Sequence, residues 1–317
     1  MKVLFRNCLA AIIWSTGILY ADTPAVLTVG QPVELTEAGT YYMAPAWAPQ
    51  GGTIAVTGPH YNGIFLVDFP DGGMVQLSDD PAAGFGMAWN HDGTEIAARI
   101  ASFADRRRLD AVAVFDAITG QKRMLTEFGS LMTGTPRWTR DDRQIYMSGT
   151  NQLQLLNLDG SLPKAADNIP AQRIIYARGN NIEARDAGTL TDVVVAAANE
   201  RILNLTISPD GDKLAYEVMG GSLWVANIDG SQAVDLGAGD DPTWNPAGDK
   251  LAFAVTTDDG HRILSADIIV VNIDGSGRVN LTATPDDLEV QPDWSPDGRW
   301  IAYHTMNDGR ILVQEVR

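Results

Sequence analysis

The sequence is poor in cysteine and in positive charge. Its 317 residues include one cysteine, Cys8, and only 23 Lys and Arg against 40 Asp and Glu, which gives a net charge of −17. A single cysteine forms no internal disulfide, and an acidic surface repels nucleic acids and anionic lipid headgroups. We therefore exclude a disulfide scaffold and a nucleic-acid-binding protein. A basic partner or a cation is favoured, with solubility alone as the alternative reason for the acidity.

No hydrophobic run is long enough to span a membrane. The longest mostly apolar stretch, Cys8 to Tyr20, is interrupted by Ser15, Thr16 and Gly17 and falls short of the roughly 20 residues that cross a bilayer. With Lys2 and Arg6 before it and the small Ala21 after it, residues 1–21 have the pattern of a secretory signal peptide. We predict cleavage after Ala21, export to the periplasm or beyond, and no transmembrane segment in the mature chain.

Common catalytic and metal-binding motifs are also absent. The sequence has no G-x-S-x-G nucleophile elbow and no D-x-[DN]-x-[DN]-G-x5-E calcium loop, and it contains only 4 histidines. We therefore assign no catalytic residue and no cofactor, with a divalent cation as the alternative. A protein that is not an enzyme is favoured, and the question stays open.

What the sequence does contain is a repeat. Six segments share a pattern in which an aromatic or apolar marker precedes a turn and an apolar strand. The markers are Trp47, Trp89, Trp138, Ile207, Trp244 and Trp294. Their intervals run from 37 to 69 residues, and most are typical of the blades of a β-propeller.

Each unit predicts a four-stranded antiparallel blade. A strand ends at the marker, an Asp-Gly type of turn follows, and two further strands are joined to a short fourth one by turns such as Asp229-Gly230 and Asp274-Gly275. Aspartates of this kind form turns through local hydrogen bonds. We therefore interpret five of them as structural rather than as ligands: Asp92, Asp210, Asp229, Asp274 and Asp297.

The 69-residue interval and the chain ends decide how many blades the ring has and how it closes. Within the interval, Ile174 to Tyr176, Asn181 to Ala187 and Asp192 to Ala197 repeat the second, third and fourth strands without the marker. We therefore predict one all-β domain over residues 22–317 with seven blades, one of them degenerate, and keep six as the alternative. The last unit lacks its fourth strand, and residues 33–36 are predicted to supply it and close the ring.

These units, above all PDWSPDGRWIAY near Trp294, resemble the propeller repeats of TolB, the periplasmic component of the Tol-Pal envelope system. They are also similar to the propellers of prolyl-oligopeptidase-like peptidases. TolB carries an α/β domain before its propeller, whereas here only about a dozen residues separate the expected mature start, Asp22, from the first expected strand. The resemblance implies a TolB-like propeller that stands alone, and a fold used by binding platforms and by enzymes.

Strand order assigns the loops to two faces of such a propeller. Loops between second and third strands, and between blades, lie on one face. They are expected to include the long, irregular loops TGPHYNG, IASFADRRRLD and TTDDGHRILSAD. Acidic pairs recur in the inter-blade loops of this face: Asp79 and Asp80, Asp240 and Asp241, Asp286 and Asp287. Around a central channel they would form a negative collar for a basic peptide or a cation.

Two other groups on this face are candidate binding residues. Arg106, Arg107 and Arg108 form a basic run suited to a carboxylate or a sugar acid, or they pair with neighbouring acids. His60, His261 and His304 are weak candidates for a transition-metal site. They are considered because oligogalacturonate lyases resemble this type of propeller and use a metal.

Three functions follow, in order of preference. The first is a non-catalytic periplasmic or cell-envelope module that holds a protein or peptide partner on the acidic loop face. The second is a metal-dependent, carbohydrate-active propeller enzyme of the oligogalacturonate-lyase type. The third is a propeller that binds calcium or another small ligand.

Overall fold

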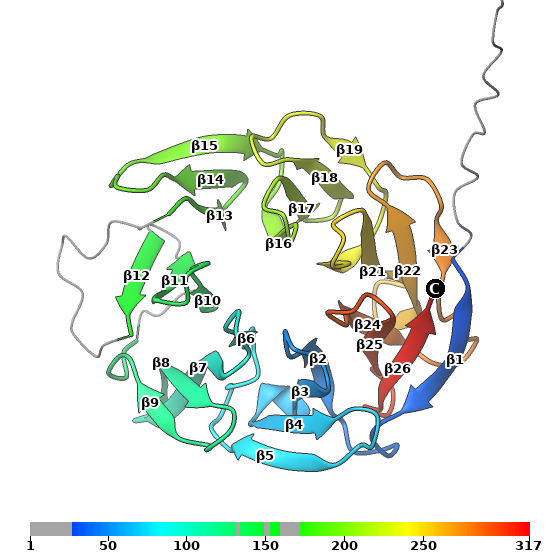
Figure 1. Cartoon of the computed structure of the whole chain (residues 1–317), viewed down its shortest axis with the longest axis horizontal. Helices are drawn as coiled ribbons and strands as arrows, with labels where there is room; N and C mark the ends of the chain where they lie inside the picture. The colour runs from blue at the N-terminus through cyan, green and yellow to red at the C-terminus, as the bar shows by residue number, and fades with distance from the viewer. Residues whose placement is uncertain (1–26, 131–133, 149–152, 159–171) are drawn as a thin grey trace, which may run out of the picture.

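The repeated units fold into seven small antiparallel sheets around a central axis (Figure 1). The computed structural model describes residues 27–130, 134–148, 153–158 and 172–317. The predicted seven-bladed β-propeller is confirmed, and the six-bladed alternative is wrong. The predicted signal peptide, residues 1–21, lies outside the described residues. Within those residues there is no helix with the length and apolar character needed to cross a membrane.

The blades follow one another in chain order, with the innermost strand first. Blade 1 contains β2 (Met43–Trp47), β3 (Thr53–Thr57), β4 (Ile64–Asp68) and β5 (Met74–Ser78), with a single 3-10 turn at Pro59–Tyr61. Blade 2 contains β6 (Ala88–Trp89), β7 (Glu95–Ala104), β8 (Arg107–Asp116) and β9 (Lys122–Met124). Blade 3 contains β10 (Arg137–Trp138), β11 (Gln144–Ser148) and β12 (Leu153–Asn157), and blade 4 contains β13 (Ile174–Arg178), β14 (Asn181–Arg185) and β15 (Asp192–Ala197).

The remaining three blades each have four strands. Blade 5 contains β16 (Ile202–Ile207), β17 (Lys213–Val218), β18 (Leu223–Asn227) and β19 (Val234–Asp235). Blade 6 contains β20 (Asp240–Trp244), β21 (Lys250–Asp258), β22 (Ile263–Asn272) and β23 (Val279–Asn280). Blade 7 contains β24 (Glu289–Trp294), β25 (Trp300–Thr305), β26 (Ile311–Val316) and, from the other end of the chain, β1 (Val29–Glu34).

The degenerate unit of the long interval forms blade 4. Its three described strands, β13 to β15, pair in the order β13-β14-β15. They fall on the predicted segments, although β13 runs two residues further, to Arg178. Apolar residues such as Ile182 and Ala184 are completely buried in this blade, so it packs into the ring without a marker tryptophan.

Ring closure follows the prediction, with a longer strand. β1 pairs antiparallel with β26, and Val33 lies opposite Val313. This pairing begins at Val29 and continues to Leu35, whose N–H donates to the Ile311 carbonyl at 2.9 Å. The predicted segment 33–36 covers the C-terminal part of the pairing. The edge of blade 7 is thereby covered.

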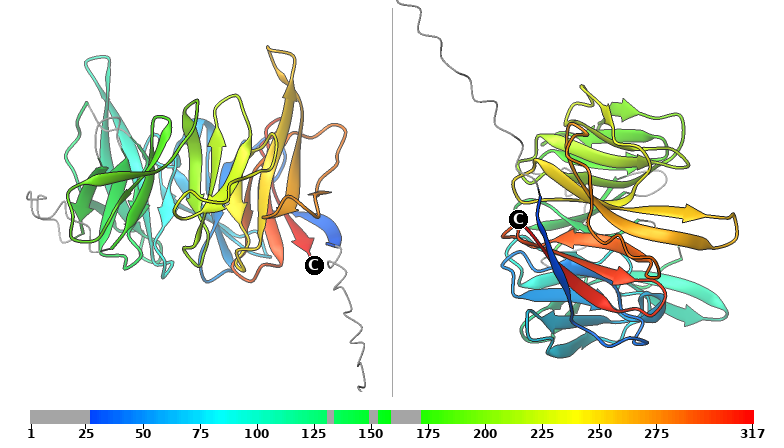
Figure 2. Two further views of the ribbon diagram at one scale, coloured as in Figure 1. Left: turned by 90° about the horizontal axis from the view of Figure 1, so that it is seen from above. Right: turned by 90° about the vertical axis from the view of Figure 1, so that its right-hand side faces the viewer.

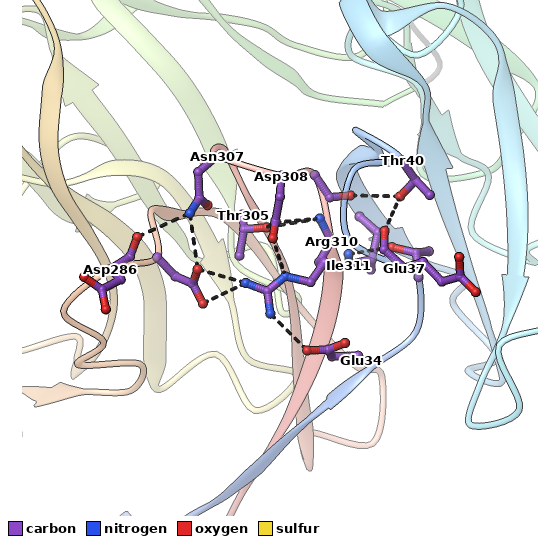
Figure 3. A network of polar contacts seen from close by, with 12 residues as sticks. Glu34, Glu37, Thr40, Asp286, Thr305, Asn307, Asp308, Arg310 and Ile311 are labelled. Atoms are coloured by element: carbon purple, nitrogen blue, oxygen red, sulfur yellow. Dashed lines mark hydrogen bonds and ion pairs between the residues drawn. The ribbon is translucent and has the colours of Figure 1, made fainter.

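Ion pairs of Arg310 stabilise this closure of the ring (Figure 3). Its guanidinium bonds Glu34 of β1 at 2.9 Å, Asp308 at 2.8 Å and both carboxylate oxygens of Asp287 at 2.8 Å. Partial burial alone would lower the pKa of Arg310, but these carboxylates raise it. The N-terminal strand is thus joined to blade 7 by charge as well as by backbone hydrogen bonds.

The core lies between neighbouring blades. Leu223 and Val225 of blade 5 pack with Trp244 and Phe253 of blade 6 in one buried cluster. Four of the five marker tryptophans are 6–7% exposed: Trp47, Trp138, Trp244 and Trp294. Because each blade presents both of its sheet faces to a neighbour, the ring is held together by apolar burial on both sides of every blade.

The two faces of the propeller differ in their connections. We call the face with the turns between first and second strands the turn face, and the face with the second-to-third connections and the inter-blade loops the loop face. On the loop face, the hairpins β7–β8 and β21–β22 project well beyond the other blades (Figure 2).

These hairpins correct one sequence interpretation. Two of the segments expected as long irregular loops are regular strands, with β7, β8 and β22 each 10 residues long. The β7–β8 tip turns at Asp105 and Arg106, both at positive φ. Each hairpin is supported by the following inter-blade loop, through Asp110–Gly129 and Ala266–Leu288 bridges.

Candidate functional site

Five carboxylates of the turn face are occupied by local hydrogen bonds. Asp210 accepts from Ser208 Oγ at 2.5 Å and from the Asp212 N–H at 3.1 Å, and Asp297 is bonded in the same way by Ser295 and Arg299. Asp92, Asp229 and Asp274 also accept from the backbone N–H two residues ahead. The prediction that these five aspartates form turns is confirmed. Hydrogen bonds of this kind lower the pKa of Asp210 and its counterparts Asp92, Asp229 and Asp274.

The inner strands share a backbone irregularity near the loop face. In five blades the residue three positions before the marker has a positive φ: Ala44, Gly86, Asn204, Asp241 and Gln291. In four of these blades the pairing between first and second strands shifts at this residue, as expected for a β-bulge. Bulges re-aim side chains, so these residues form the rim of the central space.

A cavity of about 1210 Å³ occupies the centre of the ring. At its loop-face end it is lined by Tyr61, Phe85 and the rim residues, and at its turn-face end by residues such as Ser208 and Pro209. It therefore runs between the two faces, within the part of the chain that the structure describes. Central cavities with a few polar groups are the usual binding sites of such folds.

A hydrogen-bonded acidic cluster lies at the rim between blades 5 and 6. Asn204 Nδ2 donates to Glu217 Oε1 and to Asp241 Oδ1, both at 2.8 Å, and the Asp241 N–H donates to Glu217 Oε1 at 2.5 Å. Glu217 is 6% exposed. Burial raises the pKa of Glu217 to about 7 and that of Asp241 to about 6, and Asp240 adds to the latter shift. Both carboxyls therefore titrate near neutral pH.

Asp293 is a second carboxyl in the cavity. It accepts from the Trp47 N–H of blade 1 at 2.7 Å and from Thr243 Oγ1 of blade 6 at 3.1 Å. Desolvation raises its pKa to about 6, against the effect of these two hydrogen bonds. Asp293 thereby bridges three consecutive blades at the wall of the cavity.

In each predicted acidic pair, the two members have different environments. The second member of each pair is bonded inward: Asp80 to Lys122 at 2.8 Å, Asp241 to Asn204 and Asp287 to Arg310. The first members, Asp79, Asp240 and Asp286, are exposed. Of the six, only Asp241 lines the central cavity. The other five lie on the loop face outside it.

The predicted arginine run lies at the tip of the β7–β8 hairpin. Arg106, Arg107 and Arg108 are all exposed, and Arg108 bonds Asp110 at 2.9 Å. The expected pairing with a neighbouring acid is therefore present for Arg108. Arg106 and Arg107 project with Phe103, which is 69% exposed.

The three histidines occupy different environments. His60 is exposed in the Pro59–Tyr61 turn, and His261 is exposed at the tip of the β21–β22 hairpin. His304 is buried in β25, where its Nδ1 accepts from the Ala44 N–H at 3.4 Å, and burial lowers its pKa to about 4. Across the described ranges, no group of three or more His, Cys, Asp or Glu is arranged to hold a metal ion.

Sequence reasoning missed Asn204, Glu217, Gln291 and Asp293. Three of the rim residues were identifiable in principle, because Asn204, Asp241 and Gln291 each stand three residues before a marker. Glu217 and Asp293 have no such signal. Apart from the bond between Asn204 and Glu217 within blade 5, their partners come from other blades, up to 246 positions away in the chain.

Comparisons with known proteins support the architecture. TolB from Acinetobacter baumannii matches with a TM-score of 0.56 and 17% identity over 82% of this chain, and the match covers 59% of the TolB chain. A putative TolB from Agrobacterium tumefaciens matches with a TM-score of 0.54 and 15% identity, over 92% of this chain and 98% of its own. A chain of a mitotic checkpoint complex matches with a TM-score of 0.61 and 14% identity, over 99% of this chain and 98% of its own.

The protein is a seven-bladed β-propeller whose fold is similar to that of the TolB structures. No protein-family model matches the sequence, and no curated protein matches it. Structural matches extend to 1112 chains, so the architecture is too widely shared to define an activity. The function must be argued from the residues of the loop face and the cavity.

Proposed function

We propose that this chain is an exported, non-catalytic binding module of the cell envelope that holds a protein or peptide partner on its loop face. The likeness to TolB propellers supports an interaction role in the periplasm at a coarse level. The observation that supports the loop face as the binding surface is the distribution of exposed apolar side chains.

Large apolar residues are exposed mainly on the loop face. Seven of them, 41–69% exposed, lie in its loops and hairpins: Tyr41, Phe85, Phe103, Phe128, Met219, Leu264 and Met306. In the turn-face loops that the structure describes, the corresponding residues are only Ile118 and Leu190. Aromatic and methionine side chains are enriched in protein interfaces, so their concentration on one face favours a docking surface.

The charge of this face favours a basic partner. Asp79, Asp240 and Asp286 are exposed beside the apolar residues, and Asp241 lies at the cavity rim. Exposed charges at an interface act mainly on the association rate and on specificity, and their effect weakens with salt. A partner held here would present Lys or Arg to these carboxylates.

The test is a cross-linked pull-down from envelope extract with the tagged mature protein. We expect one partner whose recovery falls several-fold when Asp79, Asp240 and Asp286 are changed to Asn, and falls further with Phe103→Ser. A matched control changes Asp68, Asp71 and Asp212 to Asn, three exposed turn-face carboxylates for which the structure shows no side-chain hydrogen bond. Equal recovery by both triple variants, or no partner at all, would contradict the proposal.

A further inference from the structure

One wall of the central cavity is basic, although the protein as a whole is acidic. Arg137 and Arg140 of blade 3 and Arg173 at the start of blade 4 all line the cavity. Arg137 stands one residue before its marker. At the same position the other marked blades carry Ala46, Ala88, Thr206, Thr243 and Asp293. Blade 3 is therefore the only marked blade with a cation at this level.

Two of these arginines have no counter-ion among the residues that the structure describes. Arg137 and Arg140 make no hydrogen bond or ion pair with any described residue, whereas Arg173 lies 3.5 Å from Asp186. Elsewhere in the protein, arginines beside carboxylates are bonded to them, as Arg185 is to Asp192 at 2.6 Å. A guanidinium that lines a cavity without a partner is free to bind an oxyanion through paired N–H donors.

The acidic residues occupy other parts of the same cavity. Asp241 lies at the loop-face rim in blade 6, and Asp293 lies in blade 7, across the ring from blade 3. Arg140 and Arg173 lie at the turn-face end, next to the turn between β10 and β11 and at the beginning of β13. A ligand that fills the cavity from the loop face therefore meets Asp241 first, then Arg137 and Asp293 on opposite sides of the ring, and Arg140 and Arg173 last.

The dimensions suit a single extended chain. From Asn204 at the rim to Pro209 at the turn face is five residue steps along β16 and the start of its turn, or roughly 17 Å at the rise of a β-strand. An extended peptide of about five residues spans this depth. A chain end enters such a cavity as one strand, whereas an internal loop needs two, and only a carboxyl end places a backbone carboxylate at the bottom.

We propose that the cavity receives the free carboxyl terminus of the partner, with the α-carboxylate bound by Arg137 and Arg140 and a preceding cationic residue near Asp241. This rests on the proposed function, because it names the part of a peptide partner that enters the ring. Arg173 adds positive charge beside the carboxylate. The apolar rim residues Tyr61 and Phe85 contact the segment where it enters.

The experiment compares two mixtures of randomised hexapeptides on the immobilised mature protein, one with free carboxyl termini and one with amidated termini. We expect the free-terminus mixture to be retained at least about tenfold better, because hydrogen bonds between two charged groups are the strong ones. Arg137→Gln with Arg140→Gln removes this preference, and the Lys variants of both residues retain part of it. The matched control is Arg143→Gln with Arg201→Gln, which makes the same charge change at two exposed arginines outside the cavity.

Equal retention of both mixtures, retention of neither, or a preference that survives Arg137→Gln with Arg140→Gln would overturn the proposal. Binding of inorganic phosphate without retention of either peptide mixture would also overturn it, because the arginines would then form a site for small anions only. The pull-down separates the two proposals. A partner captured through Asp79, Asp240 and Asp286 without a carboxyl-terminus preference leaves the loop-face function intact and removes this inference alone.

Discussion

The turn face and the loop face are built from the same seven blades but use their carboxylates differently. On the turn face, Asp210 and Asp297 accept hydrogen bonds from their own turns, and the same arrangement recurs from blade to blade. On the loop face, each acidic pair has one member bonded inward and one exposed. Uniform local bonding maintains the scaffold, whereas divided pairs leave charge available for a partner.

The largest expected effect is at the closure of the ring on the loop face. Arg310→Gln removes ion pairs to Glu34, Asp287 and Asp308 from a side chain that is only 16% exposed. We expect a loss of about 2–4 kcal/mol in the free energy of unfolding, because three carboxylates then lack their cation. Urea denaturation measures it.

The control for this variant is Arg299→Gln, which removes an exposed ion pair to Glu315. Its expected cost is below about 1 kcal/mol. Equal costs for the two variants would mean that the inward-bonded acids do not anchor the ring.

The second prediction concerns Glu217 and pH. Because the folded pKa of Glu217 is raised to about 7, the folded state binds its proton more tightly than the unfolded state does. This contribution to stability is complete below the ordinary pKa of 4.5 and is lost as the pH rises to about 7. Glu217→Gln keeps an oxygen for Asn204 and the Asp241 N–H, so we expect it to be more stable than wild type at pH 8 by about 1–3 kcal/mol.

At pH 4 the difference between wild type and Glu217→Gln should disappear. Comparing the two proteins at each pH removes the opposite contribution of His304, whose lowered pKa costs stability as the pH falls from 6.5 to about 4. Glu200→Gln, an exposed change on the same face, serves as the control. A pH-independent difference for Glu217→Gln would show that its carboxyl is not desolvated.

A third prediction compares the two faces within blade 5. Ser208 is 3% exposed, and its Oγ accepts from the Lys213 N–H at 2.9 Å on the turn face. Ser208→Ala is expected to cost about 1–2 kcal/mol, because it leaves the partly buried Lys213 N–H without its acceptor and removes one of the two donors to Asp210. Ser222→Ala on the loop face should change stability by less than about 0.5 kcal/mol. Thermal unfolding of both variants checks this, and the reverse order would contradict the division between the faces.

The smallest expected effect separates binding from stability. A triple variant should change the free energy of unfolding by less than about 0.5 kcal/mol when it combines Asp79→Asn, Asp240→Asn and Asp286→Asn, because these carboxylates are exposed. Asp80→Asn should cost more than any one of them, because Asp80 is bonded to Lys122 and to Ser78. If the exposed triple variant unfolds as easily as Asp80→Asn, the two members of a pair have the same role.

Much of the scaffold was predictable, because its signals are local. Turn residues such as Asp210-Gly211 lie within five positions of the groups that they bond, so each blade was visible in isolation. Ring closure was also predictable, since a unit without a fourth strand at one end requires a spare strand at the other. The boundary of β1 differed by four residues because its outer end is exposed and carries no apolar pattern.

The cavity was less predictable for a physical reason. Asp293 depends on Trp47 and Thr243, which lie in different blades. Arg137 is notable because it lines the cavity and no described carboxylate bonds it. The β7–β8 hairpin was mistaken for a loop because Asp105 and Arg106 turn the chain without a glycine. Such features arise from contacts between blades and cannot be derived from the pattern of one repeat.

The antiparallel pairing of β1 with β26 also determines how the ring responds to mechanical load. Thr28 and Arg317 bond each other at the same end of the pair, and Glu34 lies at the far end near Arg310. A force applied between Thr28 and Arg317 would unzip the two strands one hydrogen bond at a time instead of shearing them together. Blade 7 would open first, and the Arg310–Glu34 contact would be among the last to break.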